Sequence, residues 1–328
     1  MRIYLPLFAA TLLLAFLLRW SIRRRRRSTS TLPRVALLAT AILAGLLAIL
    51  STGAGAYMVW YAHRAQPAPE RRPLFVGIDY ARHVRQSPRP MVVHAMTIDL
   101  RAPGVSFLVT PARPTDGRVV RAQKTSAFLE EFNCQAAVNG NYFYPFKSSS
   151  PLDYFPHAGD GVSLSGFAAS RGAVYSDKQW MPGVLYLSED NQASFDAPIG
   201  PVYNAIAGNG FLVADGKPVA PPPADDVPYP RAAVGLSADR RYLTFVIIDG
   251  KQPGYSEGAT LTELSHVLIE LGVHTAARLD EGGSCAMAVE ERPGKAKLLN
   301  VPINHRIPYV ERVVANHLGI YARRLPAR

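Results

Sequence analysis

Acidic residues are absent from the start of this chain, and cysteine is scarce throughout it. Among 328 residues there are two cysteines, Cys134 and Cys285, which excludes a scaffold held by several disulfides. No Asp or Glu precedes His63, whereas eight arginines do, so the formal net charge of +11 falls to +3 for the remainder. The basicity is therefore local. It is not the extended basic face of a nucleic-acid-binding protein, and no nucleic-acid partner is expected.

The sequence gives no support to three other common enzyme classes. The eight histidines are scattered and show no close pair of the kind that binds zinc. The segment GDGVSLSG, residues 159–166, does not form the nucleophile turn of a serine hydrolase. No GxxxxGK[ST] loop is present either. A zinc enzyme, a serine hydrolase and an ATP-driven function are therefore not expected.

Two apolar runs lie on either side of the basic cluster Arg23 to Arg27. Ile3 to Leu18 and Val35 to Tyr61 carry no charge. The second run exceeds the about 20 residues that span a bilayer, and it closes with aromatic residues that suit the interface. The first run alone resembles a signal peptide, but the positive charge of a signal precedes its apolar run, whereas here it follows. We therefore predict two transmembrane helices.

The positive loop between the runs predicts the topology, because such loops remain in the cytoplasm. We expect a multi-pass protein of the cell membrane whose C-terminal domain is extracytoplasmic. The predicted parts are a first span at 1–22, a cytoplasmic loop at 23–34, a second span at 35–61, a linker at 62–73 and a domain at 74–328. An oxidising location would allow Cys134 and Cys285 to pair; the alternative is two separate, half-buried thiols.

The C-terminal domain is rich in predicted strands. Met91 to Leu100 and Gly104 to Thr110 flank a Pro-Gly turn, which predicts a hairpin, and Lys124 to Phe132 fits a short helix. Further strands are expected within residues 134–140, 183–188, 205–216 and 311–322. The fold class that follows is α+β, a mixed β-sheet domain with few helices, preceded by the two transmembrane helices.

One segment predicts where polar residues meet. Its expected strands are Arg231 to Ser237, Tyr242 to Gly250 and His274 to Asp280, and a helix that begins with a Thr260–Glu263 capping box joins the last two. Such a crossover makes those two strands parallel, so Asp249 and Asp280 reach the same sheet edge, with Arg231 beside them. If the two strands are immediate neighbours, the carboxylates approach the about 5 Å separation of retaining glycoside hydrolysis.

Five motifs occur in an order that resembles one known family. They are AAVNGNYF, PRAAVGLS, LTFVIIDG, the helix with TLTELS, and ARLDEGGSCAMAV. In this order they resemble the phosphodiester glycosidase family, over roughly residues 76–322. Two departures stand out. This chain has Asn-Gly-Asn-Tyr-Phe where the family commonly has Asn-Gly-Gly-Phe, and Glu281 replaces the first glycine of the family's Gly-Gly-Gly-Ser turn.

The resemblance implies a set of site residues. The candidate catalytic acids are Asp280, Asp249 and Glu281. The candidate substrate-binding residues are Arg231, Asn139, Gly140, Gly282, Gly283 and Ser284.

Each of these roles has a structural alternative. Asp280 can serve as a turn carboxylate, and the glycines can form a simple turn rather than a concavity of N–H groups for an anion. Arg231 can clamp a phosphate or form an ion pair with Asp249. Asn139 can hold substrate or adopt a left-handed turn.

The resemblance implies a membrane-anchored hydrolase that cleaves a sugar-1-phosphodiester in a glycan or a glycolipid. The carbohydrate phosphodiester is thus the expected partner besides the membrane. The alternative function is a non-catalytic module that binds or organises an exported polysaccharide. No organic cofactor is implied; the acids leave room for a divalent cation such as calcium, although no ligand spacing requires one.

Overall fold

The computed structural model describes residues 15–16, 19–20, 22–23, 31–150, 153–195, 197–219 and 226–326. The chain divides into two compact units, residues 1–65 and 66–328. Each unit is described separately below.

The first unit contains the helix α2, Thr31–Ala62. Its segment Leu38–Ala62 is long and apolar enough to cross a membrane, with a mean hydropathy of 1.9. It is the one candidate span among the described residues. Most of the first predicted span, Ile3 to Leu18, lies outside the described residues, so the structure supports one apolar helix rather than the predicted pair.

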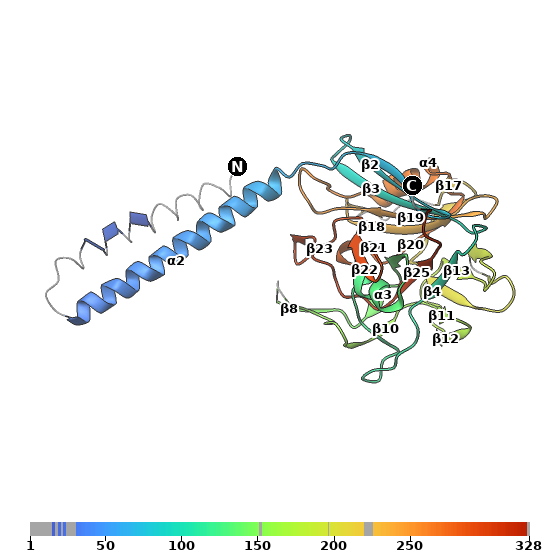
Figure 1. Ribbon diagram of the computed structural model, residues 1–328, viewed down its shortest axis with the longest axis horizontal. Helices are drawn as coiled ribbons and strands as arrows, with labels where there is room; N and C mark the ends of the chain where they lie inside the picture. Colours follow the sequence, from blue (N-terminus) through green and yellow to red (C-terminus); the bar gives the residue numbers. More distant parts are fainter. Residues whose placement is uncertain are drawn as a thin grey trace. The chain divides into compact units, whose positions relative to one another are not determined.

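The second unit is built on an eight-stranded sheet with the order β1-β2-β3-β19-β18-β20-β16-β17. In that order the strands are Glu70–Phe75, Ile78–Arg85, Met91–Asp99, Tyr242–Ile248, Arg231–Leu236, Thr275–Arg278, Phe211–Ala214 and Lys217–Pro218. Strand β1 therefore begins inside the segment expected to be linker. The α4 helix, Leu261–Glu270, covers one face of this sheet (Figure 1).

A five-stranded sheet packs against the other face, in the order β22-β21-β6-β25-β4. These strands are Lys295–Leu298, Met287–Arg292, Ala136–Asn139, His317–Tyr321 and Ser106–Val109. The core between the two sheets includes Phe245 and Ile247 from the first and Met287 and Leu318 from the second. The α3 helix, Thr125–Phe132, lies on the far face of the five-stranded sheet (Figure 1).

The remaining strands form smaller sheets. A second five-stranded sheet has the order β12 (Ala173–Ser176), β11 (Ala168–Ser170), β15 (Asn204–Ala207), β13 (Val184–Leu187) and β14 (Ala193–Phe195). A three-stranded sheet consists of β5 (Val120–Arg121), β10 (Gly161–Leu164) and β7 (Phe143–Tyr144). Two hairpins pair β8 (Lys147–Ser150) with β9 (Asp153–Phe155) and β23 (Ile303–Asn304) with β24 (Ile307–Pro308).

The α+β class is confirmed, the predicted hairpin is wrong, and the condition that two parallel strands are neighbours is not met. Strands β3 and β4 do not form a hairpin, because β3 pairs with β2 and β19 whereas β4 pairs with β25 in the other sheet. Strands β19 and β20 run in the same direction but are not neighbours, because β18 lies between them and is antiparallel to both. Two strand spacings separate them by about 10 Å, so the expected close approach of neighbouring strands does not occur.

The α4 capping box and the state of the two thiols can be compared with the predictions. The capping box of α4 forms as predicted, with Thr260 Oγ1 accepting from Glu263 N at 3.1 Å and Glu263 Oε2 accepting from Thr260 N at 2.8 Å. Cys134 and Cys285 are free and buried in separate hydrophobic clusters. The structure thus favours the alternative of two separate thiols, although both are fully buried.

Candidate active site

The turn that follows β20 is held in place by the end of β6. Asp280 N donates to Gly140 O at 3.0 Å, and Asn139 Nδ2 donates to Asp280 O at 2.8 Å. Asn139 Oδ1 accepts from Ala286 N at 3.1 Å, so one amide side chain closes both ends of the turn. Asn139 is extended and buried, which excludes the left-handed turn considered for it. Its amide positions the turn rather than facing a ligand.

Asp280 lies at the centre of this turn with 8% of its surface exposed. Its Oδ1 accepts from Glu281 N at 2.8 Å. Burial raises the pKa of Asp280 from 3.8 to about 7, against the opposing effects of the Ser284 hydroxyl and the Arg312 guanidinium. A carboxyl group with such a pKa can hold or release a proton near neutral pH, as general acid–base catalysis requires.

Arg312 brings the positive charge next to Asp280. Its Nη1 lies 3.4 Å from Ser284 Oγ, its Nε donates to Asn304 Oδ1 at 3.2 Å, and its guanidinium lies 4.7 Å from the centre of the Phe146 ring. Within the described ranges no carboxylate forms an ion pair with it. A planar fork without a carboxylate partner is suited to bind phosphate oxygens.

Sequence reasoning missed Arg312, because ERVVANHLGIYA was interpreted only as a strand. The strand begins later, at His317. An arginine beside an acid, ahead of the last strand, was the available signal. Its neighbour Glu311 is buried and binds the first turn of α3, accepting from Ser126 N at 2.9 Å.

Arg231 forms ion pairs with two acids of the chain, Asp226 and Glu281. Its Nη1 lies 2.8 Å from Glu281 Oε2 and its Nη2 lies 3.1 Å from Asp226 Oδ1, while Nε donates to Ala259 O at 2.9 Å. The ion pair with Asp249 that was considered as an alternative does not form, because Arg231 pairs in register with Ile248 and side chains alternate between the faces of a strand. Two carboxylates already neutralise this guanidinium, which favours a structural role.

Glu281 has one oxygen engaged and one free among the residues described. Its side chain is 9% exposed, Oε2 binds Arg231, and Oε1 is buried without a hydrogen-bond partner. Burial raises the pKa of Glu281, and the positive charges of Arg231 and Arg278 oppose that effect. Tyr142 lies close by, since the charges of Glu281 and Asp280 contribute, after burial, to raising the pKa of its phenol.

Asp249 is enclosed by donors of the chain itself. Its carboxylate accepts from Val301 N at 3.0 Å and Asn300 Nδ2 at 3.2 Å, and His94 Nε2 lies 3.1 Å away. The same Asn300 amide also donates to Cys285 O at 3.1 Å. Asp249 is 2% exposed, so its carboxylate is enclosed and it helps position the turn through Asn300.

The glycine turn is not the expected concavity of three N–H groups. Gly282 N donates to Pro230 O at 3.0 Å and Ser284 N to Glu281 O at 3.3 Å, so two of the three donors are used within the chain. The close approach that the glycines permit is to other side chains. A Cβ on Gly283 would lie 2.5 Å from Arg312 Nη2. Gly283 therefore leaves room for the guanidinium beside the turn.

Residues 254–258 read Gly-Tyr-Ser-Glu-Gly, which matches the Gly-x-Ser-x-Gly pattern of serine hydrolases. Ser256 is fully buried; its Oγ donates to Asp249 O at 2.6 Å and accepts from Val92 N at 3.0 Å. It follows no strand-to-helix turn, which a nucleophilic serine of this motif requires. Ser256 is a structural residue.

The structure thus brings Asp280, Glu281, Gly283, Ser284 and Arg312 together at one sheet edge. Among the described residues, no three His, Cys, Asp or Glu side chains gather as a metal site requires.

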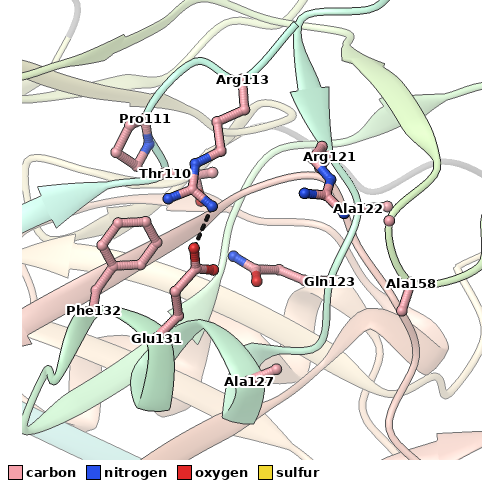
Figure 2. Close-up of a pocket in the computed structure, with 11 residues that line it drawn as sticks. Thr110, Pro111, Arg113, Arg121, Ala122, Gln123, Ala127, Glu131, Phe132 and Ala158 are labelled. Carbon is pink, nitrogen blue, oxygen red and sulfur yellow. Dashed lines mark hydrogen bonds and ion pairs between the residues drawn. The ribbon is translucent and has the colours of Figure 1, made fainter. Parts of the chain in front are cut away.

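A separate cavity of about 310 Å³ lies beside α3 and contains none of the residues named as candidates. Figure 2 shows Arg113 reaching over it to Glu131, with Arg121 and Gln123 on the opposite wall. The Arg113–Glu131 ion pair satisfies the charges on one side. We do not assign the chemistry to this cavity.

A comparison with known families gives a match that spans the turn. The sequence model of the phosphodiester glycosidases matches residues 132–321, which contain all the predicted site residues and Arg312. The chain belongs to the phosphodiester glycosidase family. The members of this family are hydrolases of phosphodiester-linked sugars. The comparison with curated protein sequences found no match.

Two solved structures are similar to this phosphodiester glycosidase in fold. One is the zebrafish N-acetylglucosamine-1-phosphodiester α-N-acetylglucosaminidase catalytic domain, auto-inhibited by its pro-peptide, with a TM-score of 0.56 and 20% identity over 80% of this chain and 86% of that one. The other is a hypothetical protein from Synechocystis, with a TM-score of 0.59 and 16% identity over 78% of this chain. The match spans 64% of the Synechocystis chain.

Proposed function

We propose that this protein hydrolyses the bond between the anomeric carbon of a sugar and a phosphodiester. The observation that supports this most is the buried carboxyl of Asp280, whose pKa is raised to about 7. It lies near Arg312, an arginine that has no carboxylate partner among the described residues. Acid–base chemistry and phosphate binding are thereby available within one turn. The substrate would be a carbohydrate phosphodiester of a glycan or glycolipid.

Arg312 would bind the phosphate of the substrate. Ser284 Oγ, 3.4 Å from Arg312 Nη1, would add a hydroxyl donor to the same group. Negative charge develops on the phosphate as the glycosidic bond breaks, and a pre-placed guanidinium stabilises that charge more in the transition state than in the ground state.

Asp280 would act in its protonated form. It would lie beside the phosphate bound by Arg312, so its ionised form would repel the substrate, whereas its proton could be delivered to the oxygen that leaves the sugar. The bond that breaks joins the anomeric carbon to this oxygen, and water then adds to the oxocarbenium-like carbon. The water gives up a proton, which restores protonated Asp280, and the products are a free sugar and a phosphomonoester.

The apolar helix would anchor the enzyme in the cell membrane, with the domain outside the cytoplasm. The support is the apolar segment Leu38–Ala62 and the cluster Arg23 to Arg27 that precedes it. Alkaline phosphatase, which is active only outside the cytoplasm, fused after Pro73 is expected to be active. An inactive but well-expressed fusion would contradict the topology.

A non-catalytic polysaccharide-binding module is the second candidate. The ion pair between Arg231 and Glu281 favours it, since a carboxylate neutralises a cation that was expected to bind phosphate. A hydrolase would convert the sugar phosphodiester to products, whereas a binding module would bind it unchanged.

The test is hydrolysis of a panel of p-nitrophenyl-phosphoryl sugars by the full chain in detergent. Wild-type protein is expected to release product, with Asp280→Asn reduced at least about 100-fold, the low end for losing acid–base catalysis. Asp239→Asn, a carboxyl-to-amide change at an exposed turn, is the matched control and should retain full activity. Binding of these sugars without turnover would instead identify a binding module.

A further inference from the structure

An aromatic platform lies next to Arg312. We use this name for Phe143, Tyr144, Phe146, Tyr154, Trp180 and His305. Phe146 and Tyr154 have ring centres 5.6 Å apart, and Tyr154 stacks on His305 at 4.3 Å. Tyr144 and Trp180 form a second group with ring centres 6.3 Å apart, and Phe143 joins the first group by its edge contact with Phe146 at 6.2 Å. Tyr144 and Phe146 are two positions apart in the chain, so the two groups are carried by one short segment.

Parts of this platform are open to solvent. Trp180 is 67% exposed and Phe146 is 44% exposed. Large aromatic faces left in water carry a cost that packing elsewhere would avoid, and clusters of them mark binding surfaces. The exposed rings are therefore a candidate ligand surface, whereas Phe143 packs against the core beneath them.

Cations accompany the rings. Lys178 Nζ lies 4.2 Å from the ring centre of Tyr144 and 4.7 Å from that of Trp180, and the Arg118 guanidinium lies 5.6 Å from Tyr144. Neither forms an ion pair with a carboxylate in the part of the chain that the structure describes. Arg312 contacts Phe146 and Tyr154 in the other group, so cations accompany both groups of rings. This arrangement complements a chain of rings joined by negative groups.

One short segment connects the platform to the candidate active site. Asn139 fixes the turn of Asp280, Tyr142 lies beside Glu281, and Phe146 supports the Arg312 guanidinium. These residues lie within eight positions of the chain. A ligand that extends from Arg312 along this segment would reach the aromatic rings.

We propose that the platform binds the following units of a phosphodiester-linked glycan, so that the substrate is a polymer and not a single sugar phosphodiester. The apolar faces of its sugar rings would stack on Phe146, Tyr154 and Trp180. Its phosphates would lie beside Lys178 and Arg118. This proposal rests on the proposed function for the cleavage step, but binding to the platform can be measured without cleavage.

Cleavage of a length series tests the proposal. The probes are N-acetylglucosamine 1-phosphodiester oligomers of one, three and six units, used with the full chain in detergent. Wild-type kcat/KM is expected to rise with length, and Trp180→Ala to lower it about tenfold for the hexamer while leaving the single unit unchanged. Tyr242→Ala, at a partly exposed tyrosine on β19, is the control and should retain the length dependence. A kcat/KM independent of length in the wild type would overturn the proposal.

Fluorescence separates this proposal from the function itself. Trp180 is the only tryptophan after Trp60, so Trp20→Phe/Trp60→Phe in the full chain leaves one reporter. With Asp280→Asn added to prevent turnover, the hexamer should change Trp180 emission saturably and at about tenfold lower concentration than the single unit. That response without any wild-type hydrolysis supports the platform and contradicts the enzyme. Hydrolysis without a response, or tighter binding of oligothymidylate than of the hexamer, overturns the platform.

Discussion

At the scale of single residues, the main result is the division of labour between two arginines. Sequence resemblance pointed to Arg231, yet that guanidinium is occupied by Asp226 and Glu281. Arg312 is the one that lies beside Ser284 and Asp280. Spacing along the chain could not show this, because the partner of an arginine depends on which strand face it occupies and on turns far away in sequence.

Gly283 provides a test of Arg312 without changing its charge. A Cβ at Gly283 would meet the flexible end of Arg312, so Gly283→Ala should displace the guanidinium and leave the fold intact. We expect a rise in KM for phosphodiester substrates of about tenfold, the loss of one charge-assisted contact, measured by steady-state kinetics.

Gly282→Ala is the matched comparison. Gly282 has φ of +67°, and its Cβ would lie 2.8 Å from Tyr229 Cε1, so this variant should lose stability as well as activity. Equal kinetics for wild type and Gly283→Ala would show that Arg312 does not bind the substrate.

The buried carboxyl of Asp280 also predicts how stability depends on pH. Its pKa is raised from 3.8 to about 7, so between these values the folded chain binds more protons than the unfolded chain, and the free energy of unfolding decreases as pH rises. Asp280→Asn removes the titrating group, so the free energy of unfolding of the variant should not show this decrease. Urea unfolding should show the variant more stable than wild type at about pH 8, by at most about 4 kcal/mol, and equal at about pH 4. A less stable variant at about pH 8 would contradict the raised pKa.

At the scale of elements, local signals were reliable and pairings were not. The capping box predicts α4, and runs rich in β-branched residues predict β3 and β19. The partners of β3 and β4 were predicted wrongly, because a Pro-Gly turn favours a hairpin locally while burial assigns the two strands to different sheets. The same sheet edge nevertheless receives Asp249, Asp280 and Arg231, since β19 and β20 run in one direction on either side of β18.

The α3 helix depends on an acid from a distant segment. Lys124 at its N-cap makes no side-chain cap, and Glu311 supplies the acceptor instead, binding Ser126 N at 2.9 Å. Glu311→Ala should lower the free energy of unfolding by about 1–2 kcal/mol, as loss of a helix cap does. Chemical denaturation measures this, and Thr260→Ala in the α4 capping box is the control for an ordinary cap. A larger effect of Glu311→Ala on turnover than Thr260→Ala is expected, because Glu311 precedes Arg312. Unchanged stability in Glu311→Ala would remove the capping role.

At the scale of the whole molecule, the sequence predicts the family and the class, and the structure corrects the site within them. Asn139, Gly140 and Asp249 become the residues that hold the turn, while Asp280, Ser284 and Arg312 face one another across it. Asp249, unlike Asp280, is enclosed by hydrogen-bond donors of Asn300 and Val301. These two residues belong to no recognisable motif, so the sequence could not show which acid is enclosed.

The dependence of kcat/KM on pH for a p-nitrophenyl-phosphoryl sugar, compared between wild type and Asp280→Asn, measures whether Asp280 is the proton donor. Because protonated Asp280 is the active form, wild-type kcat/KM should fall tenfold per pH unit above about pH 7, where its raised pKa places the transition. In Asp280→Asn the values should be at least about 100-fold lower and should lack this decline. Wild-type rates in Asp280→Asn, or the same decline in both proteins, would contradict the assignment.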